Sequence, residues 1–131
     1  MQRRKDSPIL IRLYRAAFWS AAFFALVMAS LPQPPPLPGS PNDKIQHIIA
    51  FAVLAVLAAL AFPRTGRLYL LLGLSAFGAA IELIQMIPQL HRDASWLDWS
   101  ADTGAAAAVF SAFWVFRRLA GLSSGKRPGA D

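Results

Sequence analysis

The chain contains no cysteine among its 131 residues, so it can form neither a disulfide framework nor a thiolate metal site. Charged residues are also scarce, at 15%, whereas hydrophobic residues make up 56%. A soluble domain of this size could not bury so much apolar surface, so lipid must be the solvent for most of it. Because no internal repeat and no long charge run is present, the sequence predicts one membrane-embedded domain.

Four apolar segments each approach the ~20 residues that a bilayer core requires. None has the polar face of a surface amphipathic helix. They predict an all-α, membrane-embedded four-helix bundle over residues 11–119, after a basic cytoplasmic flank at 1–10. A proline-rich linker is expected at 32–42, and the Gly- and Ser-rich residues 120–131 are expected to form a disordered cytoplasmic tail. The four segments are residues 11–31, 45–62, 68–87 and 101–119.

Lysine and arginine are distributed unevenly between the predicted connections. Eleven of the 13 basic residues fall in the amino-terminal flank, the 63–67 turn and the carboxyl-terminal flank. Only Lys44 and Arg92 fall in the other two connections. The positive-inside rule therefore places both termini in the cytoplasm, N-in/C-in. Because membrane topology accounts for the net charge of +6, no nucleic-acid partner is expected.

The first apolar segment has a second interpretation. Its basic start, its apolar run and Val27-Met28-Ala29 resemble a signal peptide with a small-residue cleavage site. The run that begins at Ile9 is long for a signal peptide, so an uncleaved anchor is favoured. Cleavage would leave three spans.

Polar side chains gather at the outward end of the predicted helices. Asp43 and His47 are four residues apart and share a helix face, with Lys44 beside it. Glu82 lies in a lipid-spanning segment, where a carboxyl costs about 2.5–3.5 kcal/mol and commonly marks a functional site. Since the second helix runs inward and the third outward, His47 and Glu82 reach a similar depth. The predicted ligand-binding residues are Asp43, Lys44, His47, Glu82, Gln85, Arg92, Asp98 and Asp102.

Other residues predict packing and boundaries near this constellation. Gly78 lies one turn before Glu82 and allows close helix approach. Trp96 and Trp99 are expected at the outer membrane interface, and Ser95-x-x-Asp98 resembles a capping box. The fourth segment carries a small-residue stripe that is expected to face its neighbours: Ala101, Gly104, Ala105 and Ala108.

Three motifs in order resemble those of VanZ-like integral membrane proteins. The first is Asp43-Lys44-x-x-His47, followed by Phe51. The second is Gly78-x-x-x-Glu82-x-x-Gln85-x-x-Pro88. The third is Arg92-x-x-Ser95-x-x-Asp98-x-x-Ala101-Asp102, with Gly104 two residues later. The resemblance covers residues 10–119, and it departs at Asp102, where the family usually has asparagine.

This resemblance implies a multi-pass protein of the bacterial inner membrane. The family is named for its association with resistance to the glycopeptide teicoplanin, so an envelope lipid or a glycopeptide-related ligand is the implied partner. The name supplies a location in the cell more than a reaction.

Three classes of function fit these residues. In a binding protein with an accessory role, Lys44 and Arg92 would hold the anionic headgroup of an envelope lipid or lipid-linked precursor. In a membrane enzyme, His47 and Glu82 would form an acid–base pair, with Asp43 or Asp98 orienting the histidine. In an accessory subunit of a membrane-protein complex, the cluster would only lock the helices together.

Catalytic and metal motifs are weak. The hydroxyls near the constellation belong to Ser95, Ser100 and Thr103, and none lies in a strong nucleophile motif. His47, Glu82, Asp98 and Asp102 offer nitrogen and oxygen ligands, but no dense ligand motif such as H-E-x-x-H is present. The sequence therefore predicts no metal site and no cofactor.

Overall fold

The structure, a computed structural model, describes residues 7–32 and 43–124, and these segments form four α-helices and one short 3-10 helix without any strand. Residues 1–6 of the expected basic flank (1–10) and residues 33–42 of the expected proline-rich linker (32–42) lie outside the described residues, while the first helix already begins at Pro8, inside the expected flank. The predicted all-α fold with four helices is confirmed. The elements are α1 (Pro8–Ser30), α2 (Asp43–Ala61), α3 (Arg67–Gln85), η1 (Pro88–Leu90) and α4 (Trp96–Ser124).

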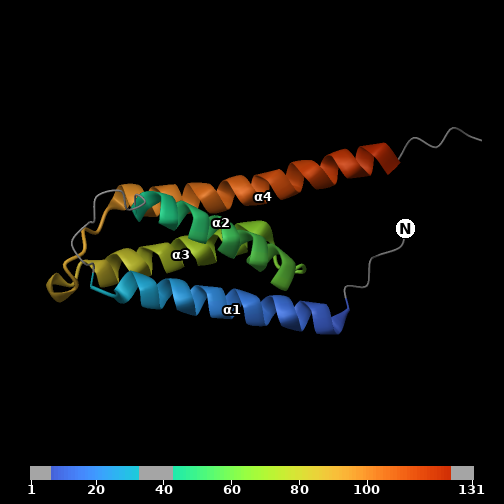
Figure 1. The fold of residues 1–131 in the computed structure, drawn as a ribbon. Coiled ribbons are helices and arrows are strands. Elements are labelled where there is room, and N and C mark those ends of the chain that lie inside the picture. The colour runs from blue at the N-terminus through green and yellow to red at the C-terminus, as the bar shows by residue number, and fades with distance from the viewer. Residues whose placement is uncertain (1–6, 33–42, 125–131) are drawn as a thin grey trace, which may run out of the picture.

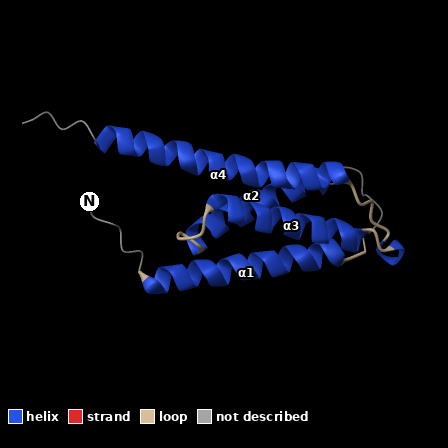
Figure 2. Ribbon diagram, turned by 180° about the vertical axis from the view of Figure 1, so that it is seen from behind, coloured by secondary structure: helices blue, strands red, loops and turns tan. Residues whose placement is uncertain are grey.

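The four helices lie lengthwise beside one another and alternate in direction (Figure 1). Helices α2 and α3 form the middle of the bundle, with α1 on one side and α4 on the other, and the view from behind shows the same order (Figure 2). Consequently α1 and α3 end, and α2 and α4 begin, at one end of the bundle. We call this end, which contains Ser30, Asp43, Gln85 and Trp96, the site end.

Close packing at the middle of the bundle depends on one glycine. Phe51 of α2 is only 2% exposed and lies against Gly78 of α3. A Cβ atom at Gly78 would lie 3.3 Å from Phe51 Cζ and 3.4 Å from Trp99 Cδ1. Helices α2, α3 and α4 can therefore approach one another just below the site end because residue 78 has no side chain.

The outer surface of the bundle is strongly apolar. Large hydrophobic side chains such as Phe23 on α1, Leu72 on α3 and Phe116 on α4 are exposed. Three helices among the described residues, α1, α2 and α3, are long and apolar enough to cross a membrane. Helix α4, the fourth expected span, is not among them, because Asp98 and Asp102 near its start and an arginine pair near its end dilute its apolar centre.

Helix α4 is longer than expected at both ends. It begins at Trp96, directly after Ser95, where the capping-box pattern predicted a helix start; the backbone N–H of Asp98 donates to Ser95 O at 2.9 Å. It continues to Ser124, so the first five residues of the expected disordered tail are helical. The run Leu119-Ala120 favours continuation, since both residues are good helix formers. Residues 125–131 lie outside the described part.

The prediction that the small-residue stripe of α4 faces the neighbouring helices is wrong. Gly104 and Ala108 are exposed, whereas Asp102, Ala106 and Phe110 are buried against the bundle. These three residues recur every four positions and therefore share one helix face. The face that carries Asp102 points inward, and this rotation brings the carboxylate to the site.

Basic side chains occupy the end of the bundle opposite the site end. Arg15 Nε donates to Ala61 O at 3.1 Å, at the carboxyl-terminal end of α2, where carbonyls lack helical partners. The guanidinium of Arg15 also lies over the Phe62 ring, and that of Arg67 lies over Phe113. These contacts keep arginines on this end, far from the acidic residues of the site end.

Candidate functional site

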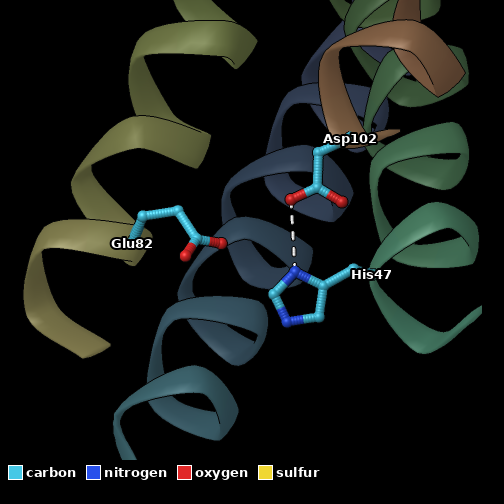
Figure 3. A group of neighbouring side chains, drawn as sticks. All are labelled: His47, Glu82 and Asp102. Carbon is cyan, nitrogen blue, oxygen red and sulfur yellow. Dashed lines mark hydrogen bonds and ion pairs between the residues drawn. The ribbon is translucent and has the colours of Figure 1, made fainter. Parts of the chain in front are cut away.

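Three helices bring three ionisable side chains together inside the site end. His47 lies one turn into α2, Glu82 lies in the last turn of α3, and Asp102 lies in the second turn of α4. One ligand atom from each residue lies within 4.8 Å of the other two. Their side chains extend from different helices into a common space, as Figure 3 shows. The prediction that His47 and Glu82 reach a similar depth is confirmed.

A hydrogen bond joins His47 and Asp102 within this cluster. Nδ1 of His47 lies 3.2 Å from Oδ2 of Asp102, within hydrogen-bonding distance, and forms an ion pair if the imidazole is protonated. The Asp102 side chain is completely buried, and that of His47 is 12% exposed. Asp102 thus contacts the imidazole, whereas Asp98, one of the two expected partners, pairs with Lys44. The side chain of Asp43, the other expected partner, lies outside the described residues.

Each carboxylate of the cluster has one oxygen with a hydrogen-bond partner and one oxygen without a partner among the described residues. Oε2 of Glu82, a residue 2% exposed, accepts a hydrogen bond from the backbone N–H of Ser95 at 2.7 Å. Within the described residues, Oε1 of Glu82 and Oδ1 of Asp102 are buried without a hydrogen-bond partner. A buried acceptor left unsatisfied costs about 1–3 kcal/mol, and more when it is charged. The two oxygens therefore call for an additional partner, such as a proton, a water molecule or a cation.

Lys44 and Arg92, the two predicted anion donors, contact separate parts of the site end. Nζ of Lys44 lies 3.5 Å from Oδ1 of Asp98, which forms an ion pair at the rim. Arg92 donates from Nε to Leu31 O at 3.0 Å and from Nη2 to Met28 O at 2.8 Å. Because these carbonyls belong to the end of α1, Arg92 caps that helix. Lys44 and Arg92 therefore contact different partners among the described residues.

Gln85 links two helices of the bundle. Its side chain is 3% exposed, and Nε2 donates to Ala29 O of α1 at 3.3 Å. This hydrogen bond ties α3 to α1 near their ends. The predicted ligand residue Gln85 therefore contacts the backbone of α1.

A pocket of about 310 Å³ opens beside the cluster, between the end of α3 and the start of α4. Glu82 lines it and is shared with the buried cluster, while Arg92 and Asp93 supply charges of opposite sign. Met86 and Trp96 add apolar walls, and Trp96 is 62% exposed, as expected for an interfacial tryptophan. The remaining lining residues are Ala94 and Ser95.

The predicted residues thus fall into distinct groups. His47, Glu82 and Asp102 form the cluster, Glu82 and Arg92 line the pocket, and Lys44 and Asp98 form a rim pair. Asp43 begins α2, but its side chain lies outside the part of the chain that the structure describes.

Two of the three candidate hydroxyls bond elsewhere. Oγ1 of Thr103 lies 3.1 Å from Oγ of Ser75, and Oγ of Ser100 donates to Trp96 O at 2.8 Å. Ser95 contributes its backbone N–H to Glu82. Ser95 therefore contacts Glu82 through its main chain, not through its hydroxyl.

The contact between Trp99 and Ser75 was missed at the sequence level. Trp99, expected at the membrane interface, donates from Nε1 to Ser75 O at 3.0 Å. Ser75 and Thr103 add a hydroxyl contact between α3 and α4. Ser95, Trp99 and Thr103 are spaced four residues apart, so they share one side of the helix. This spacing could have indicated that Trp99 lies on a packed face.

A comparison of the chain with protein-family models, curated proteins and solved structures found no match.

Proposed function

We propose that this chain is a small multi-pass protein of the bacterial inner membrane whose outward-facing pocket binds the polar headgroup of an envelope lipid or lipid-linked precursor in an accessory role. The observation that carries the proposal is the pocket in which Glu82 and Arg92 face the same space. The resemblance of three motifs to VanZ-like proteins supports the same location and extends the ligand class to glycopeptide-related molecules.

Exposed apolar side chains support membrane embedding. Water-soluble monomers rarely expose contiguous apolar patches larger than about 300–600 Å². Here Ile9, Phe23 and Tyr69 are among many large side chains exposed along the helices. With α1, α2 and α3 apolar enough to cross a bilayer, lipid is the solvent that matches this surface. Helix α4 would complete the bundle, with its polar residues turned inward.

The separation of charges supports the orientation. The end opposite the site carries Arg15, Arg64 and Arg67, and the positive-inside rule places such an end in the cytoplasm. The site end then faces outward. Helix α1 supplies the carbonyls that Gln85 and Arg92 contact, which supports an uncleaved first helix.

The residues that line the pocket support this class of ligand. Arg92 suits an anionic phosphate, and the carboxylates of Glu82 and Asp93 suit hydroxyl or amine donors. Met86 and Trp96 suit the apolar part of a lipid. A headgroup that combines a phosphate with hydroxyl or amine groups satisfies all three features.

Native mass spectrometry of the detergent-purified protein, incubated with native lipid extract, tests this proposal. We expect the wild type to retain a specific lipid. Ala94→Trp fills the pocket without removing any described hydrogen bond, so it should lose most of that lipid. Ala112→Trp places the same side chain on the exposed surface of α4 and serves as the matched control.

Equal lipid retention by Ala94→Trp and Ala112→Trp would refute pocket binding. Failure of the wild type to retain any specific lipid would have the same consequence. Size-exclusion profiles of both variants show whether the fold is retained.

Acid–base catalysis on a lipid-linked substrate is the second candidate, because Asp102 orients His47 within reach of Glu82. In this reaction water would be the nucleophile. The test is product formation from the same lipid extract, followed by mass spectrometry. Glu82→Gln should abolish turnover while the fold is preserved; turnover that persists in this variant would exclude the acid–base role.

A further inference from the structure

We propose that His47, Glu82 and Asp102 bind one first-row divalent cation, such as Zn²⁺, Mn²⁺, Fe²⁺ or Co²⁺, at the site end of the bundle. The site stands on side-chain geometry and does not rest on headgroup binding in the pocket. It changes the expectation from the sequence, which predicted no metal site.

The distances match a shared cation. Zn²⁺ binds imidazole nitrogen and carboxylate oxygen at about 2.0–2.2 Å, so two ligands at tetrahedral angles lie about 3.4 Å apart. Nδ1 of His47 and Oδ2 of Asp102 are 3.2 Å apart, close to this separation. A ligand oxygen of Glu82 lies within 4.8 Å of the other ligand atoms, so the Glu82 side chain would move closer to complete the triad.

The unsatisfied oxygens are the independent observation that points to a ligand. Oε1 of Glu82 and Oδ1 of Asp102 are buried without a partner among the described residues. Both side chains come from different helices and turn toward the same space as His47 (Figure 3). Two adjacent carboxylates with no cation between them would repel each other, whereas a divalent cation balances their two negative charges.

The donor set selects the class of metal. One imidazole with two carboxylates suits borderline transition metals, while Ca²⁺ and Mg²⁺ prefer an all-oxygen shell. Three protein ligands leave at least one coordination position for water or another ligand.

The surroundings provide the support that metal sites require. Ser95 N–H holds Oε2 of Glu82 at 2.7 Å and fixes the direction of this carboxylate, as outer-shell partners of metal ligands do. Because Glu82 also lines the pocket, that pocket gives the cation a route from outside.

Binding of Mn²⁺ and Co²⁺ to the full-length protein in detergent, after removal of metal by EDTA, tests the proposal. Electron paramagnetic resonance measures free Mn²⁺, and the visible absorption of Co²⁺ reports its coordination. We expect saturable binding of one equivalent. His47→Gln, Glu82→Gln and Asp102→Asn should each weaken binding at least about tenfold.

Asp98→Asn is the matched control, since it makes the same change one turn from Asp102 in a residue that pairs with Lys44. Its affinity should stay close to that of the wild type. Absence of saturable binding, or equal weakening by Asp98→Asn, would overturn the proposal and leave a proton or water as the partner of the two oxygens.

A spectroscopic signature of the wild type keeps the test decisive even if a variant fails to fold. Mn²⁺ bound at the proposed site must show nitrogen coupling from the imidazole of His47. One equivalent of tightly bound Mn²⁺ without nitrogen coupling would place the cation elsewhere and contradict the assignment.

Discussion

His47 of α2 and Asp102 of α4, which are 55 residues apart in the chain, are hydrogen-bonded at 3.2 Å across the interface of their two helices. This contact connects the first and third motifs of the sequence. With Glu82 of α3, it converts three separate polar positions into one buried cluster.

Replacement of Asp102 should distinguish the hydrogen bond from the charge. In metal-free protein, Asp102→Leu should lower the free energy of unfolding by about 1–3 kcal/mol, because it removes the hydrogen bond between Nδ1 of His47 and Oδ2 of Asp102. Asp102→Asn retains a polar partner for the imidazole and should lower it much less. Unfolding by SDS in mixed micelles, followed by tryptophan fluorescence, measures both values. Equal losses in the two variants would show that this hydrogen bond contributes little.

Gly78 should be intolerant of a large side chain. Gly78→Leu must displace Phe51 and Trp99, and such overpacking typically costs about 1–3 kcal/mol. Gly73→Leu on the same helix is the control, because a Cβ at Gly73 would meet no atom within 4 Å. Thermal unfolding in detergent should show a lower midpoint only for Gly78→Leu. A similar decrease for both variants would indicate a general effect of leucine in α3.

The hydrogen bond from Gln85 should stabilise the attachment of α1. Gln85→Met keeps the volume of the side chain but removes the donor to Ala29 O. Hydrogen bonds between membrane helices contribute about 0.6 kcal/mol on average and up to about 1.7 kcal/mol, which is the expected loss of unfolding free energy. Gln89→Met, in an exposed side chain of η1, is the control and should leave stability unchanged. A neutral Gln85→Met would show that packing alone holds α1.

The proposed orientation gives a direct labelling experiment, because the chain has no native cysteine. Ala94→Cys lies in the connection before α4, and Thr65→Cys lies in the turn between α2 and α3. A membrane-impermeant maleimide applied to intact spheroplasts should label Ala94→Cys and spare Thr65→Cys. Labelling of both after lysis is the control for reactivity. The reverse pattern in intact cells would invert the proposed topology.

Much of the fold follows from local pattern. Long apolar runs interrupted by proline or polar residues predict four helices, and their boundaries agree with the structure within a few residues for α1, α2 and α3. Helix α4 differs most, because it continues beyond the expected span 101–119 at both ends, over residues 96–100 and 120–124. The depth of His47 and Glu82 was also predictable, since each lies a fixed number of residues from a helix end.

The rotation of α4 was not predictable from its sequence. Alanine and glycine occur on every side of this helix, so no strong apolar stripe marks its buried face. The structure buries the face of Asp102 and Ala106 and leaves Gly104 exposed. The partner of His47 could not be predicted for the same reason, because the rotation of α4 decides whether Asp98 or Asp102 meets His47.

The number of helices, their alternating direction and the level at which polar residues gather follow from length, hydropathy and charge along the chain, so the sequence is enough to predict them. The packed bundle, in contrast, was needed to show that Arg92 caps α1, that Gln85 ties α3 to α1, and that His47 meets Asp102. Such contacts depend on how each helix is rotated about its axis, and packing between helices sets that rotation.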